Sequence, residues 1–177
     1  MKGIIAYKGK YGATRQYASW LKNELSLPLA LIDQCSKEEI AKADLMVFGS
    51  SVYIGKLLIG KWLKKHLHQL QNKKLFLFVV CGTPANKSEK LQTYLESSVP
   101  AEILHQCHVY FLPGRLIYKK LSWFDKFMLR MGAMLSKEPG AKDTAMAGYD
   151  AVKKENLDKM VNDIKKLSNK KAEPVLL

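Results

Sequence analysis

The chain has 177 residues, and its 29 Lys and Arg against 16 Asp and Glu give a formal net charge of +13, which predicts an anionic partner. Hydrophobic residues make up 47% and charged residues 25%, a balance that excludes a disordered protein and predicts one folded domain. Three cysteines, an odd and sparse number, exclude a disulfide scaffold and favour a reducing cytoplasm.

Short apolar runs and amphipathic segments alternate along the chain. The runs predicted to be strands are residues 2–7, 28–32, 44–49, 74–81 and 107–112. The segments with helical spacing are residues 14–25, 36–42, 57–71, 87–97, 121–135 and 150–168. Because the strands are nearly continuous apolar runs, they predict an α/β fold with a doubly wound, five-stranded parallel sheet that is covered on both faces.

The loops after three of these strands are expected to line one site, since ligands of such sheets lie beyond the carboxyl ends of the strands. These loops are residues 8–14, 50–56 and 82–86. In the first loop, Gly9 and Gly12 permit the positive φ angles that turn successive backbone N–H groups inward. Such a loop, followed by a helix N-terminus, predicts a phosphate site; the alternative is a plain turn between strand and helix.

Other nucleotide and metal motifs fail on particular residues. Gly55, Gly60 and Lys61 match part of a P-loop, but Trp62 follows where a hydroxyl must hold Mg²⁺. The first loop lacks the third glycine of a dinucleotide fingerprint, and it lacks the carboxylates of a receiver domain. The four histidines have no metal-ligand spacing, so no metal site is expected.

The strand, the loop KGKYGAT (8–14) and the helix after it resemble the phosphate loop of flavodoxins, whose pattern is Ser/Thr-x-Thr-Gly-x-Thr. Gly12 and Thr14 match this pattern, whereas Lys8 and Gly9 stand where hydroxyls are usual. The resemblance implies a flavodoxin-like sheet with strand order 2-1-3-4-5, in one domain over residues 1–168 with a loosely held tail at 169–177.

Two further segments resemble one branch, the flavodoxin-like, quinone-dependent protoporphyrinogen IX dehydrogenases. GSSVYIG (49–55) is similar to the second flavin loop of that branch, and GRLIYKKLSWFDKFMLRM (114–131) is similar to its late insertion. The insertion is expected over about 113–149, with a connector at 136–149. Simple flavodoxins lack this segment, so it is the most specific part of the resemblance.

The resemblance implies FMN as the cofactor, with its phosphate on residues 9–14 and its ring between the loops 50–56 and 82–86. The residues expected to bind it are Lys8, Gly9, Lys10, Tyr11, Gly12, Ala13, Thr14, Ser50, Ser51, Val52, Tyr53, Ile54, Gly55, Cys81, Gly82 and Thr83. Tyr53 is either a stacking partner of the ring or a surface aromatic, and Cys81 is either near the ring or a small core residue. No catalytic acid or base stands out.

The implied activity is the oxidation of protoporphyrinogen IX in heme biosynthesis, with a membrane quinone as the acceptor. Arg115, Lys119 and Lys120 are candidates for holding the substrate's propionates, or they form a solvated basic loop. The alternative function is a flavodoxin-type electron carrier with no substrate of its own. Lysines beside the flavin loops favour an easily reduced flavin, which suits the enzyme. Nucleic-acid binding is disfavoured, because the lysines are spread over every segment.

Residues 121–135 predict a helix with an apolar stripe. The stripe consists of Trp123, Phe124, Phe127, Met128, Met131, Met134 and Leu135, and Asp125, Lys126 and Arg130 fall on the other side. The stripe either packs on the sheet, covers an apolar substrate or lies on an anionic membrane. A cytoplasmic protein is expected, either free or peripheral on the inner face of the membrane, and the pattern leaves a homodimer open.

Overall fold

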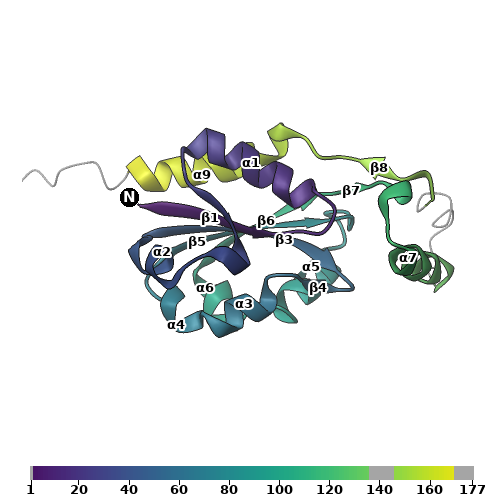
Figure 1. Cartoon of the computed structure of the whole chain (residues 1–177), viewed down its shortest axis with the longest axis horizontal. Helices are drawn as coiled ribbons and strands as arrows, with labels where there is room; N and C mark the ends of the chain where they lie inside the picture. The colour runs from purple at the N-terminus through teal and green to yellow at the C-terminus, as the bar shows by residue number, and fades with distance from the viewer. Residues whose placement is uncertain (1, 136–145, 170–177) are drawn as a thin grey trace, which may run out of the picture.

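The five predicted strands form one parallel sheet in the order β2-β1-β3-β5-β6, in a computed structural model that describes residues 2–135 and 146–169 (Figure 1). The strands are β1 (Gly3–Lys8), β2 (Leu29–Leu31), β3 (Leu45–Tyr53), β5 (Lys74–Cys81) and β6 (Cys107–Pro113). This order confirms the doubly wound sheet of the flavodoxin type. The order changes direction beside β1, so the carboxyl ends of β1, β3 and β5 lie next to one another.

Alternate strand residues enter two cores, one on each face of the sheet. Ile5, Val47 and Phe76 belong to the core under α1 (Ala13–Leu25) and α9 (Asp158–Asn169). Ala6 and Phe48 belong to the opposite core, under the remaining layer of helices. That layer contains α2 (Lys37–Lys42), α3 (Gly60–Lys65), α4 (Leu67–Leu70), α5 (Ser88–Glu96) and α6 (Ala101–Gln106). Burial on both faces explains why the strands read as continuous apolar runs.

The predicted loop at 50–56 is wrong in its first half, since β3 continues to Tyr53 and then turns back as β4 (Lys56–Leu57). The turn residues Ile54 and Gly55 have φ angles of 47° and 72°. Two positive φ angles are typical of a tight hairpin turn whose twist matches its strands. A β-branched residue rarely adopts such an angle, so Ile54 stores local strain at the edge of the expected ring site.

The predicted helix at 57–71 is also wrong, because it is two short helices that meet at His66. The His66 ring stacks on Trp62, with ring centroids 4.2 Å apart, and its Nδ1 lies 3.0 Å from Gln69 Oε1. The break itself lies in the backbone of His66, whose φ of −107° and ψ of 14° depart from helical values. The helix α6 was missed, since it has only six residues after its N-cap at Pro100.

The late insertion lies beyond the carboxyl end of the sheet (Figure 1). It contains β7 (Arg115–Leu116), a short 3-10 turn (Tyr118–Lys120) and α7 (Trp123–Leu135), and β7 pairs with β8 (Tyr149–Asp150). Most of the predicted connector, residues 136–145, falls outside the described residues, as do the tail from 170 and the side chain of Leu135. The boundary of one domain at 168 therefore stays a prediction. In the part of the chain that is described, no helix is long and apolar enough to cross a membrane.

We expect Gly49→Ala to destabilise the fold by roughly 1–3 kcal/mol, the usual cost of overpacking a core. A Cβ at this position would lie 2.2 Å from the Phe78 ring on the adjacent strand. The control is Gly132→Ala on α7, where the added carbon meets nothing within 4 Å, so better helix propensity is expected to leave stability unchanged or slightly higher. Chemical denaturation measures both, and equal stabilities of the two variants would contradict the packing argument.

Candidate functional site

The loop between β1 and α1 has the backbone of an anion site. Gly12 is the N-cap of α1 with a φ of 88°, and a Cβ there would meet nothing within 4 Å. Among the described residues no side chain caps this end of α1, so the N–H groups of its first turn remain available to a ligand. Thr14 is buried, and its side chain packs so closely on Gly9 that a Cβ at Gly9 would lie 2.6 Å away. The expectation of a positive φ at Gly9 is wrong; glycine at this position instead lets the loop fold tightly around Thr14.

Both lysines of this loop are engaged in ion pairs. Lys8 Nζ lies 2.7 Å from Asp33 Oδ2, in an exposed pair. Lys10 Nζ lies 2.7 Å from Asp125 Oδ2 and 3.8 Å from the centroid of the Tyr53 ring. Desolvation lowers the pKa of Lys10, but its hydrogen bond and charge pairing with Asp125 outweigh that effect, so the pKa lies above its ordinary value. The positive charge of this loop is therefore matched locally by carboxylates.

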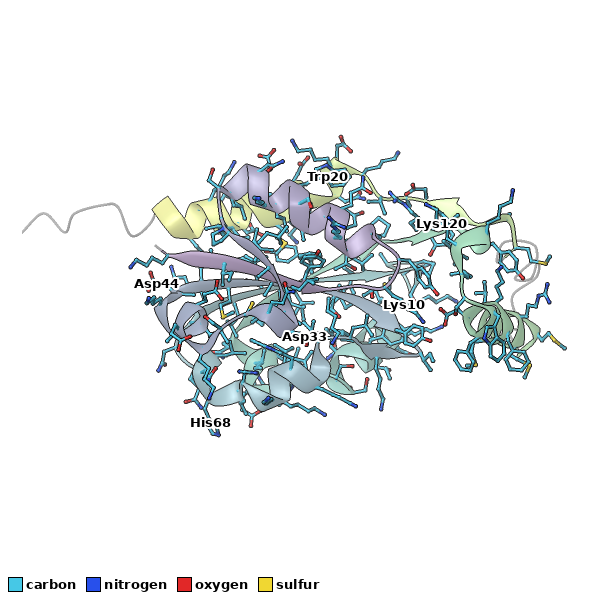
Figure 2. All side chains as sticks on the ribbon, in the orientation of Figure 1. Lys10, Trp20, Asp33, Asp44, His68 and Lys120 are labelled. Carbon is cyan, nitrogen blue, oxygen red and sulfur yellow. The ribbon has the colours of Figure 1, made fainter. Side chains whose placement is uncertain are left out.

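Asp125, the third residue of α7, joins the two flavin loops predicted from the sequence. Its carboxylate accepts hydrogen bonds from the hydroxyl of Tyr11, in the first loop, and from that of Tyr53, at 2.7 Å, in the second. The carboxylate is only 8% exposed and also pairs with Lys10. Figure 2 shows Lys10 at the end of the sheet that faces α7. We call this cluster of Asp125, Tyr11, Tyr53 and Lys10 the Asp125 hub.

The second and third loops supply small residues and buried polar atoms. The buried hydroxyl of Ser51 has no hydrogen-bond partner among the described residues, and such an orphan at a loop edge suits a polar ligand atom. Gly82 is covered by Tyr149 of β8, whose hydroxyl oxygen would lie 2.1 Å from an added Cβ. Burial raises the pKa of the Tyr149 hydroxyl and of the Cys81 thiol, so both groups stay neutral at ordinary pH. Cys81 is part of the core under the α2–α6 layer.

The three residues predicted to bind the substrate differ in their surroundings. Arg115 pairs with Asp150 of β8 at 2.8 Å and donates to Gln16 of α1 at 2.6 Å. It therefore clamps the insertion to α1, and a role toward a substrate would require it to leave these partners. Lys119 and Lys120 are exposed, and Figure 2 shows Lys120 at the end of the molecule that carries the insertion. All three assignments to substrate stay predictions.

The apolar stripe of α7 faces outward. Trp123 is 80% exposed, and Phe124, Phe127, Met128, Met131 and Met134 are also exposed. The interpretation that this stripe packs on the sheet is therefore wrong, since the opposite side of the helix, with Asp125, faces the loops. Tyr11 and Ile54, from the first two loops, are exposed large hydrophobics of the same end of the molecule. We call α7, Tyr11 and Ile54 the apolar end.

The structure brings the three predicted loops together and adds residues that sequence reasoning missed. The missed residues are Asp125, Tyr149 and Asp150. Asp125 carried one usable signal, because it is the single acidic residue among the aromatic and methionine residues of 121–135. Tyr149 and Asp150 carried none, because they reach the site through a two-residue strand beyond a long connector.

The three loops fit FMN. The uncapped end of α1 beyond Gly12 offers backbone donors to a phosphate, and the Ser51 hydroxyl and the Tyr53 ring lie at the end of β3, where the isoalloxazine ring is expected. As individual ligands, the residues of 8–14, 50–55 and 81–83 stay predictions. Within the described ranges, no three His, Cys, Asp or Glu side chains are grouped as metal ligands would be.

Several known proteins are similar to this chain. Protoporphyrinogen IX dehydrogenase [quinone] of Escherichia coli strain K12 is 26% identical over 157 residues, which cover 81% of this chain and 84% of that protein. Uncharacterized protein MJ0298 of Methanocaldococcus jannaschii is 36% identical over 91 residues; the match spans 50% of this chain and 59% of that protein.

Solved structures with partial similarity include a flavodoxin from the domain Archaea, with 18% identity, a TM-score of 0.41, and coverage of 67% of this chain and 87% of that one. Another is an azoreductase from Bacillus anthracis, with 9% identity, a TM-score of 0.45, and coverage of 96% and 100%. Similarities of this size do not bear on the activity. The family model described as Flavodoxin domain matches residues 4–144, more than half of the sequence. This chain therefore belongs to the flavodoxin domain family.

Proposed function

We propose that this protein is an FMN-dependent oxidoreductase that passes electrons from a porphyrinogen-like substrate to a quinone. The observation that carries the proposal is the apolar end, since large exposed hydrophobics border the same loops that are expected to hold the flavin. A porphyrinogen and a quinone are both large apolar reactants that need such a surface. The named relative from E. coli, aligned over 81% of this chain, supports the same reaction.

Different residues of the chain bind the phosphate, border the ring and bind the substrate. The amides beyond Gly12, at the positive end of the α1 dipole, bind the phosphate dianion. Tyr53 and the Ile54–Gly55 turn border the ring and limit the access of water to it. Lys119 and Lys120, which are exposed at the rim, pair with substrate carboxylates. Bound FMN supplies the electron and hydride chemistry.

The membrane is the proposed source of the quinone. The apolar side of α7 is exposed, and Lys119, Lys120 and Arg130 are exposed around it. Aromatic residues flanked by basic ones are typical of a helix that lies in the interface of an anionic bilayer. This arrangement supports a peripheral protein whose flavin loops open toward the lipid.

We expect the purified protein to be yellow or to bind added FMN, and to oxidise protoporphyrinogen IX with a quinone under anaerobic conditions. The assay follows porphyrin fluorescence, and exclusion of air prevents spontaneous oxidation. A protein that binds FMN but turns over no porphyrinogen would instead be the flavodoxin-type electron carrier. A protein that binds no FMN after careful reconstitution would contradict both functions.

We expect Gly12→Ala to weaken FMN binding by roughly tenfold, because left-handed backbone costs an ordinary residue about 1–2 kcal/mol and the loop amides would turn away from the phosphate. Riboflavin, which lacks the phosphate, is the matched ligand, and its affinity is expected to change little. Fluorescence titration with both flavins measures this. Equal losses for FMN and riboflavin would place the phosphate somewhere other than on this loop.

We expect the double variant Trp123→Gln and Phe127→Gln to bind vesicles at least roughly tenfold more weakly than the wild type, since each buried aromatic contributes about 2 kcal/mol. Sedimentation with phosphatidylglycerol–phosphatidylcholine vesicles at low salt measures the partition. The control is Leu31→Gln, an exposed apolar residue on β2 and not on α7. A wild type that stays in the supernatant at low salt would exclude the membrane role.

A further inference from the structure

The carboxylate of Asp125 has an unusual set of partners for a residue in an exposed helix. Three side chains from two separate loops converge on it: the Tyr11 hydroxyl, the Tyr53 hydroxyl at 2.7 Å and the Lys10 ammonium at 2.7 Å. The residue is 8% exposed, whereas most of the side chains around it on α7 are exposed. A buried carboxylate is costly unless its oxygens accept enough hydrogen bonds, and these donors meet that requirement.

The same contacts attach α7 to the rest of the molecule. The apolar side of this helix faces outward, so it contributes little packing against the sheet. The N-terminal turn of α7 is held from within by the bond from the Asp125 N–H to Ser122 Oγ, at 3.2 Å. The link from that turn to Tyr53 and Lys10 then runs through the carboxylate of Asp125, and Tyr11 is held both by this carboxylate and by a long hydrogen bond from the Ser122 N–H, at 3.5 Å.

The loop partners lie next to the residues whose backbone the site depends on. Tyr11 precedes Gly12, whose positive φ opens the phosphate loop. Tyr53 precedes Ile54, whose positive φ is strained. A group that fixes both tyrosines therefore also restrains both turns.

We propose that Asp125 is the positioning residue of the flavin site: its carboxylate locks the phosphate loop, the ring loop and α7 into one arrangement. The inference rests on the proposed function for the identity of the ligand. It goes beyond that function by coupling two events, since ordering of the flavin loops also turns the apolar side of α7 outward. The lysine in the hub has a second effect, because its pairing with Asp125 keeps a positive charge neutralised beside the Tyr53 ring.

The test compares Asp125→Asn with Asp33→Asn. Both aspartates pair with a lysine of the same loop at 2.7 Å, but the Asp33 side chain is 60% exposed and contributes little. The Asn side chain keeps the shape of Asp125 and retains one acceptor oxygen, so it cannot serve all three donors.

The first readout uses the protein without flavin. Trypsin is expected to cleave Asp125→Asn at least roughly tenfold faster than the wild type at Lys119, Lys120, Lys126 and Arg130, with Asp33→Asn unchanged.

The second readout uses FMN and riboflavin. We expect Asp125→Asn to weaken the binding of FMN and of riboflavin by a similar factor of roughly ten, since it releases the ring loop as well as the phosphate loop. The affinity ratio of reduced to oxidised FMN is expected to rise several-fold, because Lys10 loses its counter-charge and favours the anionic reduced flavin. A purely structural role would lower both affinities without moving this ratio.

Each outcome decides something. If Asp125→Asn matches Asp33→Asn in proteolysis and in flavin affinity, the proposal is overturned. If proteolysis rises but flavin affinity and the reduced-to-oxidised ratio do not change, Asp125 only anchors the helix and is not a positioning residue of the site. If the wild type binds neither flavin, the proposed function fails, and the proteolysis comparison alone decides whether the carboxylate holds α7.

Discussion

The architecture of this site depends on one buried carboxylate. Asp125 enters from the insertion and accepts hydrogen bonds from two tyrosines that belong to different loops of the sheet. The sheet itself brings those loops to one edge, because β1 and β3 are adjacent and parallel. The parallel strand pairs end at Lys8 and at Ser51, so they fix neither Tyr11 nor Tyr53, which lies in the β3–β4 hairpin. The carboxylate supplies what the sheet cannot: a common partner for the tips, placed by a helix outside the core.

The electrostatics of the loops follow from this arrangement. A loop with two lysines beside a phosphate site suggests a strong positive field. Each lysine instead has its own carboxylate, Lys8 with Asp33 and Lys10 with Asp125. The charge argument for an easily reduced flavin is therefore weaker than the sequence suggests, since paired charges largely cancel at the ring. Among the described residues no side chain caps the backbone donors at the end of α1, which leaves them as the main attraction for the proposed phosphate.

The sheet could be predicted well from the sequence, and the residues at the edges of the site could be predicted only poorly. Five strands could be predicted, because burial on both faces makes each strand a continuous apolar run, as in residues 74–81, and their order followed from the resemblance to flavodoxins. The break at His66 and the hairpin at Ile54 could not, since they depend on backbone angles at two residues whose side chains do not signal them, and a β-branched residue such as Ile54 disfavours its positive φ. The pattern of residues 121–135 predicted which residues form the apolar side and the polar side of α7, but not which side faces the rest of the molecule. The apolar side of a helix normally turns inward, and here a single Asp on the polar side has three partners that outweigh that preference.

This inversion has a physical reason. Asp125 on the polar side of α7 can be buried only because it meets three donors at once, which offsets the cost of removing its charge from water, whereas Arg130 on that side stays exposed. The apolar side is then left in water, at a cost that grows with its area. Such a surface is stable only if the hub holds it there, and it is useful only if something apolar covers it in function. The exposed aromatic face beside the flavin loops therefore destabilises the folded chain. Such a face is expected where the reactants themselves are apolar.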